Sequence, residues 1–145
     1  MTEFIPKCEN YVQLVQKAFD QQGFMKHLGV EIAEIKPGYC ELHLPYKKEL
    51  DQHHGYFHGG VIGSLADVSG GFAGFSLLPE GKAMLTVEYK LNIIAPGKGD
   101  YLKGVGRVVK AGRTLTVTEI DVFGVSGGQE VQCATAIQTL MCVVS

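Results

Sequence analysis

The sequence predicts an α+β domain in which a curled antiparallel sheet wraps around one long helix. The first observation is the segment 59–78, GGVIGSLADVSGGFAGFSLL, which carries apolar residues at helical spacing and a single charged residue. The second is a switch to a period of two after residue 83, where apolar and polar residues alternate as in half-buried strands. Because short turns separate these strands, they are expected to pair antiparallel, with the helix covering their apolar face.

A single domain, residues 1–145, is expected, since this length suffices for one full-sized core. Residues 1–28 form a helical leader in this interpretation. A helix is predicted from Lys7 to Phe19, with a stop at residues 21–23 and a further short turn up to Leu28. This leader either caps a binding cleft or packs against the edge of the sheet.

Two strands are predicted next, at 29–36 and 39–45. The turn between them has Pro37 at its second position and Gly38 at its third, so the two strands should form an antiparallel hairpin. A polar, histidine-rich loop, residues 46–57, then leads into the long helix.

Four further strands are predicted at 84–93, 101–109, 115–125 and 130–144. In the first of them, Leu85, Val87, Tyr89, Leu91 and Ile93 alternate with polar residues that include Thr86. Gly127-Gly128 indicates a tight hairpin between the last two. The four strands are expected to form an extended meander whose edge must be covered or paired, which indicates oligomerisation.

The long helix is expected to have two different faces. Its apolar face comprises Val61, Leu65, Val68, Phe72 and Phe75. Its second face comprises Gly63, Asp67, Gly70, Gly71 and Gly74. Each interior glycine costs about 1 kcal/mol relative to alanine, so the glycine-rich face is predicted to admit a partner subunit or a ligand close to Asp67. The alternative is a helix-packing seam in which Asp67 has a structural hydrogen bond.

Composition excludes several classes of function. The formal charge of −2 and the absence of a basic cluster argue against a nucleic-acid partner. No apolar run reaches the roughly 18 residues that cross a membrane, and the first residues do not resemble a secretory signal, so a cytoplasmic protein is expected. The four scattered cysteines are expected to be reduced thiols. The histidines lack partners at ligand spacing, so neither a metal nor another cofactor is expected.

The residues from 52 to 67 carry a family resemblance. Gln52, Gly55 and His58-Gly59-Gly60, with Asp67 nine residues after the histidine, resemble the PaaI-like branch of the hotdog-fold acyl-CoA thioesterases. That family pattern is Asn-x-x-Gly-x-x-His-Gly-Gly followed by an acidic residue on the central helix, and Gln52 replaces its Asn. Further similar segments are 86–88, 95–97 and 112–114. The resemblance runs from about residue 29 to the C-terminus and implies the hotdog fold.

Thioester hydrolysis needs a base or nucleophile, donors for the developing oxyanion, and a leaving group. Asp67 is the candidate base or nucleophile. The backbone N–H of Gly59, at the start of the helix, can polarise the thioester carbonyl. A thiol ionises near pH 8–9, roughly, so a thiolate can leave without a strong general acid.

By resemblance, His58 and Gln52 hold the loop and help to polarise the carbonyl, and Thr86 orients the attacking water. The residues expected to contact substrate or CoA are Phe57, Gly60, Lys110 and Arg113, the last two through the CoA phosphates. Each assignment has a structural alternative: His58 only caps the helix, Thr86 is only a strand former, Phe57 belongs to the core, and the two cations form a solvated turn.

The resemblance implies an acyl-CoA substrate and a homodimer, or a tetramer of two dimers, whose sites take the acid and the loop from different subunits. Two other functions compete with an acyl- or aryl-CoA thioesterase. One is a non-catalytic acyl-CoA-binding hotdog domain, against which Asp67 argues because a negative charge gives nothing to acyl binding. The other is a 3-hydroxyacyl thioester dehydratase, against which the lack of a Pro-rich turn beside His58 argues.

Overall fold

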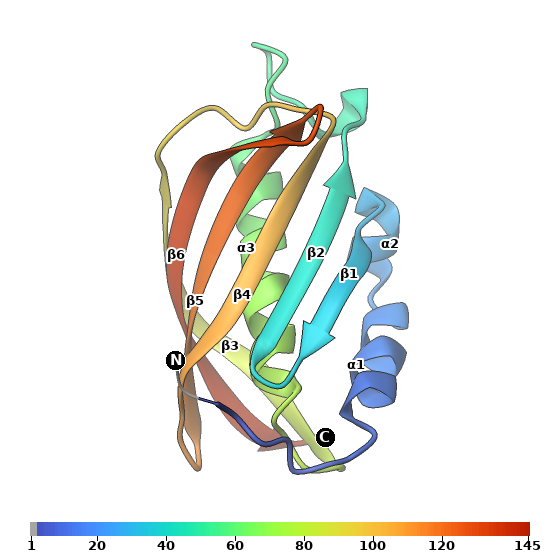
Figure 1. Ribbon diagram of the computed structural model, residues 1–145, viewed down its shortest axis with the longest axis vertical. Helices are drawn as coiled ribbons and strands as arrows, with labels where there is room; N and C mark the ends of the chain where they lie inside the picture. Colours follow the sequence, from blue (N-terminus) through green and yellow to red (C-terminus); the bar gives the residue numbers. More distant parts are fainter. Residues whose placement is uncertain (1–2) are drawn as a thin grey trace.

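The computed structural model describes residues 3–145 and confirms the expected α+β architecture. Figure 1 shows an antiparallel sheet that curls around the central helix α3. The helices are α1 (Tyr11–Asp20), α2 (Gly23–Leu28), the short 3-10 turn η1 (Lys48–Leu50) and α3 (Gly59–Phe75). The strands are β1 (Glu31–Lys36), β2 (Tyr39–Pro45), β3 (Lys82–Ile93), β4 (Tyr101–Ala111), β5 (Leu115–Ser126) and β6 (Gln129–Val144). None of the helices within residues 3–145 is long and apolar enough to cross a membrane.

The leader forms two short helices that lie beside β1 in Figure 1. α1 begins at Tyr11, four residues later than predicted, and ends at Asp20 beside the expected stop. Its buried residue Phe19 meets Phe72 of α3 edge to face, with ring centroids 5.8 Å apart. The leader is therefore anchored on the central helix as well as beside the sheet.

Both predicted hairpin turns are present. Lys36 pairs with Tyr39 across Pro37-Gly38, and Gly38 has the positive φ of 74° that this turn requires. Ser126 pairs with Gln129 across Gly127-Gly128, whose φ values of 56° and 80° match a two-residue hairpin turn with two left-handed residues.

The predicted meander of four consecutive strands is wrong for its first strand. The strand order is β1-β2-β4-β5-β6-β3, so β3 pairs with β6 and β4 pairs with β2. Helix α3 carries the chain from β2 to the far side of the sheet, and the segment 94–100 returns across the top of the sheet to β4 (Figure 1). β3 is consequently an edge strand, and its exposed apolar side chains are Leu85, Val87, Tyr89 and Ile93, at 42–58% exposure.

The predicted glycine-rich face of α3 is divided between the sheet and a pocket. Gly70 and Gly74 rest on the sheet, contrary to the prediction, whereas Asp67 and Gly71 line the pocket. A Cβ on Gly70 would lie 2.1 Å from Oε1 of Gln138, and one on Gly74 would lie 2.6 Å from Leu140. On the sheet side, a Cβ on Gly106 of β4 would lie 2.3 Å from the carbonyl oxygen of Ser69. Glycines on both elements thus let the helix backbone approach the sheet more closely than side chains would allow. In the predicted apolar stripe, Leu65 and Phe72 are buried in the core, and the half-buried Val61, Val68 and Phe75 pack against it.

A β-bulge in β3 corrects the predicted alternation of that strand. Leu85 pairs with Met141, Thr86 with Leu140, and Tyr89 with Gln138, with the irregularity between Thr86 and Glu88. Val87 is the extra residue, so residues on either side of it are out of phase. Thr86 and Tyr89 therefore share the face toward α3, whereas Leu85 lies on the outer face.

Candidate active site

Asp67 lies on α3 and is half-buried. Its carboxylate oxygen Oδ1 accepts two hydrogen bonds, one from the Thr86 hydroxyl at 2.7 Å and one from the Gln138 amide Nε2 at 2.6 Å. Among residues 3–145, no donor lies within hydrogen-bonding distance of Oδ2. The structure thus brings the predicted pair Asp67 and Thr86 together and adds a third residue that sequence reasoning missed.

The third residue, Gln138 on β6, is fully buried. Its Nε2 also donates to the backbone carbonyl of Asp67 at 3.1 Å, and its Oε1 accepts from the hydroxyl of buried Thr118 at 2.8 Å. A signal for it exists in the sequence, because Gln138 interrupts a row of inward-facing apolar residues on its strand: Ala134, Ala136 and Leu140. An amide in such a row needs partners.

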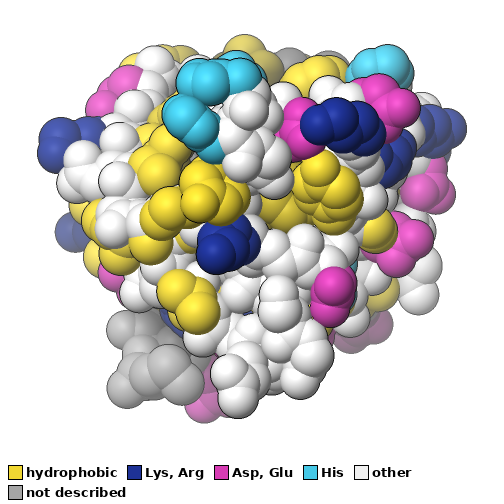
Figure 2. All heavy atoms as spheres, turned by 90° about the horizontal axis from the view of Figure 1, so that it is seen from above, with side chains coloured by type: hydrophobic (Ala, Val, Ile, Leu, Met, Phe, Trp, Pro, Cys, Tyr) yellow, Lys and Arg dark blue, Asp and Glu magenta, His cyan; other side chains and the backbone are white. Residues whose placement is uncertain are grey.

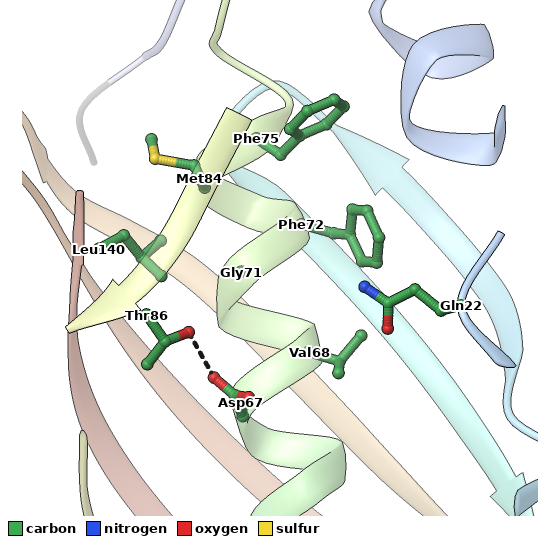
Figure 3. Close-up of a pocket in the computed structure, with 9 residues that line it drawn as sticks. All are labelled: Gln22, Asp67, Val68, Gly71, Phe72, Phe75, Met84, Thr86 and Leu140. Atoms are coloured by element: carbon green, nitrogen blue, oxygen red, sulfur yellow. Dashed lines mark hydrogen bonds between the residues drawn. The ribbon is translucent and has the colours of Figure 1, made fainter. Parts of the chain in front are cut away.

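A pocket of about 110 Å³ opens beside Asp67 and Thr86. Figure 3 shows it between α3, the start of β3 and the leader. Its lining residues are Gln22, Asp67, Val68, Gly71, Phe72, Phe75, Met84, Thr86 and Leu140. Because Gln22 belongs to the junction of α1 and α2, the leader forms part of the pocket wall in addition to packing on the helix. The walls combine apolar side chains such as Phe72 and Met84 with the polar groups of Gln22, Asp67 and Thr86.

The His58-Gly59-Gly60 motif lies at the N-terminus of α3. Phe75, which lines the pocket, lies at the other end of the helix. His58 is the N-cap, and its ring Nδ1 accepts the Gly60 N–H at 2.8 Å. The N–H groups of Val61 and Ile62 both donate to the His58 carbonyl. The Gly59 N–H has no acceptor within residues 3–145, so one of the four orphan donors of this helix end is available.

The loop before the helix is closed on itself. Gln52 makes three hydrogen bonds within the loop: its Oε1 accepts from the His54 N–H, its N–H donates to Tyr56, and its carbonyl accepts from Gly55. The amide hydrogens of its side chain have no acceptor in the described part of the chain. Asp51 closes the base of the loop, where hydrogen bonds from Tyr46 and Lys48 lower the pKa of its carboxyl.

Figure 2 looks onto this end of the molecule, where histidine side chains gather beside an apolar patch. The rings of His53 and His54 are adjacent, with centroids 4.0 Å apart and their planes tilted by 43°. A second pocket of about 230 Å³ lies here, lined by Tyr46, Gly55, Tyr56, Phe57, Gly97, Lys98 and Gly99. Phe57 is buried and lines this pocket, and Lys98 lies over the Tyr56 ring, 5.6 Å from its centroid. Lys98 is not among the residues predicted to contact substrate or CoA.

One chain does not bring all predicted site residues together. Gly59 and Asp67 are eight residues apart on one helix, so at about 1.5 Å per residue they are about 12 Å apart along its axis. Lys110 pairs with Val117 on the outer face of the sheet, and exposed Arg113 follows in the turn. Neither cation lines the Asp67 pocket. Within residues 3–145, no three His, Cys, Asp or Glu side chains are grouped to hold a metal ion.

Comparisons with known proteins show the family and the fold of the chain. Residues 54–131 match the model of a family described as the thioesterase superfamily. A thioesterase family protein from Silicibacter pomeroyi is 39% identical, with a TM-score of 0.91 over 93% of this chain and 99% of that chain. A protein of Halobacterium salinarum that is named as an esterase is 33% identical over 120 residues, which are 79% of either chain. The PaaI protein of E. coli has a TM-score of 0.83 at 21% identity over 92% of this chain and 94% of its own, a likeness of fold.

Proposed function

We propose that this chain, which belongs to the thioesterase superfamily and has the hotdog fold, is an acyl-CoA thioesterase. It would hydrolyse an acyl- or aryl-CoA thioester to the free acid and CoA, without a cofactor. The observation that carries the proposal is the Asp67 carboxylate: two donors bind one of its oxygens, at the wall of a pocket that is lined in part by apolar side chains.

Asp67 can act in either of two ways. As a general base, Oδ2 takes a proton from water while the water oxygen bonds to the thioester carbon. As a nucleophile, Oδ2 itself bonds to that carbon and forms a mixed anhydride, which water then cleaves to restore the carboxylate. In both routes the C–S bond breaks and its electron pair leaves with the CoA sulfur as a thiolate. Thr86 already donates its single proton to Oδ1, so it can assist water only as an acceptor.

The developing oxyanion is assigned to the Gly59 N–H and the Gln52 amide. The Gly59 N–H is unpaired within the described residues and lies at the positive end of the helix dipole. The Gln52 side chain uses its oxygen within the loop and retains its two amide hydrogens for a ligand. His58 supports both groups by capping the helix, which fixes the position of the loop.

A complete site in this proposal needs two copies of the chain. The separation of about 12 Å between Gly59 and Asp67 is too long for both to act on one carbonyl carbon within a subunit. The pocket beside Asp67, at about 110 Å³, is also smaller than the usual range of roughly 300–1,000 Å³ for ligand sites. We therefore assign the oxyanion donors of each site to one subunit and Asp67 to its partner.

Strand β3 is the surface that we assign to the dimer. It is an edge strand of twelve residues, and exposed Tyr89 and Ile93 lie next to the first half of α3. Pairing of two copies along this edge would cover the unpaired backbone groups of both. The outer face of the sheet carries a second apolar row, Leu85, Met141 and Leu115, joined by direct strand pairing, which we assign to contact between two dimers.

The proposal is tested with a panel of acyl-CoA substrates that vary in chain length and include aryl groups. Release of free CoA thiol is followed with a thiol reagent, and enoyl absorbance is followed with a 3-hydroxyacyl substrate. Hydrolysis of at least one thioester by the wild-type chain is expected, with loss of that activity in Asp67→Asn. Tight binding of acyl-CoA without thiol release would instead indicate a binding module, and enoyl formation would indicate a dehydratase.

A further inference from the structure

Gln138 is a polar side chain in an apolar setting. It is 0% exposed and lies on the inner face of β6 between Ala136 and Leu140. Burying an amide without partners costs free energy, and an apolar residue of similar size would pack against its neighbours instead. Gln138 must therefore be stabilised in the core by the hydrogen bonds that it makes.

Those bonds leave only one orientation for the amide. Nε2 donates to two oxygens of Asp67, the carboxylate Oδ1 and the backbone carbonyl, and it lies 3.4 Å from the Thr86 hydroxyl. Oε1 accepts from Thr118. If the amide were flipped, Oε1 would face two acceptors of Asp67, which is repulsive, whereas the Thr118 hydroxyl could accept or donate in either arrangement. Asp67 thus sets which end of the amide faces it, and Thr118 holds the other end.

The same bonds select between the two oxygens of the Asp67 carboxylate. Gln138 and Thr86 both donate to Oδ1, from β6 and β3 respectively. Two donors from different strands restrict rotation about the Cβ–Cγ bond of Asp67. Oδ2, which has no donor among residues 3–145, is left as the oxygen that can meet a reactant, and Figure 3 shows the Asp67–Thr86 bond at the edge of the pocket.

The absence of a side chain at Gly70 leaves space beside the helix for the Gln138 amide. A Cβ on Gly70 would lie 2.1 Å from Gln138 Oε1 and 2.8 Å from Thr118 Oγ1. Any larger residue at position 70 would displace both groups of the Gln138–Thr118 pair. A glycine in the interior of α3, with its cost in helix stability, is explained by the space that this pair needs.

We propose that Gln138 is a positioning residue for Asp67, which holds Oδ1 so that Oδ2 faces the thioester. This inference rests on the proposed function for its kinetic consequence, but not for its geometry. In this role Gln138 contacts neither substrate nor water. It acts through the orientation of the carboxylate, and a misplacement of a reacting group by about 1 Å can cost on the order of 10²-fold in rate.

The test is Gln138→Leu, which keeps the approximate size of the side chain and removes both hydrogen bonds to Asp67. The matched control is Gln132→Leu, because Gln132 lies on the same strand and donates to a different carboxylate, Asp121, at 2.8 Å. With the best acyl-CoA substrate, kcat should fall by about 10- to 100-fold in Gln138→Leu while KM changes by less than about threefold. Gln132→Leu should retain the wild-type kcat. A kcat of wild-type size in folded Gln138→Leu would overturn the proposal.

Two further measurements cover the other outcomes. If Gln138→Leu does not fold, Thr118→Val is used: it frees only the far end of the amide, and kcat should fall by about three- to tenfold, so an unchanged kcat counts against positioning. If the wild-type chain hydrolyses no thioester, the proposed function fails, and a crystal structure of Gln138→Leu decides the geometry. A rotated or disordered Asp67 carboxylate supports positioning, and an unchanged Asp67 bonded to Thr86 refutes it.

Discussion

Asp67 and Thr86 are nineteen residues apart in the sequence and share a hydrogen bond of 2.7 Å that connects α3 to the edge strand β3. The bulge at Val87 lets Thr86 and Tyr89, which are three residues apart, both lie on the face of β3 toward the helix. The carboxylate of Asp67 is therefore attached to the part of the sheet that we assign to the dimer.

Replacement of Asp67 by asparagine should abolish hydrolysis and leave the fold intact. Asparagine retains an oxygen that can accept from Thr86 and Gln138, but it has no basic or nucleophilic oxygen in the place of Oδ2. A loss of kcat on the order of 10²–10⁴-fold is expected from the missing base alone. Thiol release measures the loss, and calorimetric titration with a non-hydrolysable CoA thioether should show unchanged affinity. Turnover near the wild-type rate would remove Asp67 from the mechanism.

Gly59→Pro should remove the oxyanion donor without harming the helix. Gly59 is the first residue of α3, a position that tolerates proline, and His58 before it is already extended at φ −62° and ψ 140°. Loss of this N–H should lower kcat by about 10²–10³-fold. Gly59→Ala is the control, since it keeps the N–H and meets only the flexible end of Ile93, 3.2 Å away. Equal kinetics in the two variants would exclude the Gly59 N–H as a donor.

A mixture of two inactive variants should regain activity if the sites are shared. In a heterodimer of Asp67→Asn and Gly59→Pro, one site receives an intact acid and an intact helix N-terminus from different subunits, and the other site receives neither. Random assembly of equal amounts should give about a quarter of the wild-type activity, because half of the dimers are mixed and each has one working site. Coexpression with two affinity tags isolates the heterodimer. If it is as inactive as its parents, each site belongs to one chain.

The role of Gln52 can be divided between its oxygen and its amide hydrogens. The oxygen accepts from the His54 N–H, and glutamate at this position would preserve that bond while removing the two donors. If Gln52 polarises the thioester, both Gln52→Ala and Gln52→Glu should lower kcat and kcat/KM together, by about 10-fold or more. Gln52→Asn tests whether the loop can relax to the shorter family residue. Near-normal kcat in Gln52→Glu with a lower melting temperature in Gln52→Ala would make Gln52 a loop residue only.

Two neighbouring glycines of α3 should respond to alanine in opposite directions. Gly70→Ala places a Cβ 2.1 Å from Gln138 and should destabilise the protein by about 1–3 kcal/mol. A Cβ on Gly71 meets no atom within 4 Å, so Gly71→Ala should stabilise the protein by up to about 1 kcal/mol through helix propensity. Thermal unfolding of the two variants gives the comparison. Similar melting temperatures would mean that α3 does not lie as close to the sheet as the structure shows.

Most of the fold could be predicted from local patterns. The turns at Pro37-Gly38 and Gly127-Gly128 and the period-two segments gave strand positions to within a few residues, because turn chemistry and alternation act over short distances. The strand order could not be read in this way. Pairing of β3 with β6 depends on how far α3 carries the chain. The bulge at Val87 also reverses which residues of β3 face the helix, so that simple alternation along the sequence assigns the wrong face on one side of it.

The candidate site was predicted in part for a related reason. The loop and helix of the site are adjacent in sequence, and their residues could be identified together by resemblance. Gln138 lies 71 residues after Asp67, and only the closed sheet places its amide against the carboxylate. The use of the glycine-rich face was predicted only in part: Asp67 and Gly71 line a pocket, but Gly70 and Gly74 rest on the sheet. Glycine permits close approach of any neighbour, and the sequence does not say whether that neighbour is a ligand, a partner or the chain's own sheet.

The strand order also has a consequence for the time at which the chain can fold during synthesis. β3 has a single partner strand, β6, and the connecting segment contains β4 and β5. As the polypeptide leaves the ribosome, residues 82–93 emerge well before residues 129–144 and have neither sheet neighbour nor completed core in the interval. Strand pairs of such long sequence separation form slowly, and an unpaired apolar strand can meet a strand of another nascent chain. Translation rate and chaperone access in this interval should therefore influence the yield of folded protein more than changes in the β1–β2 hairpin do.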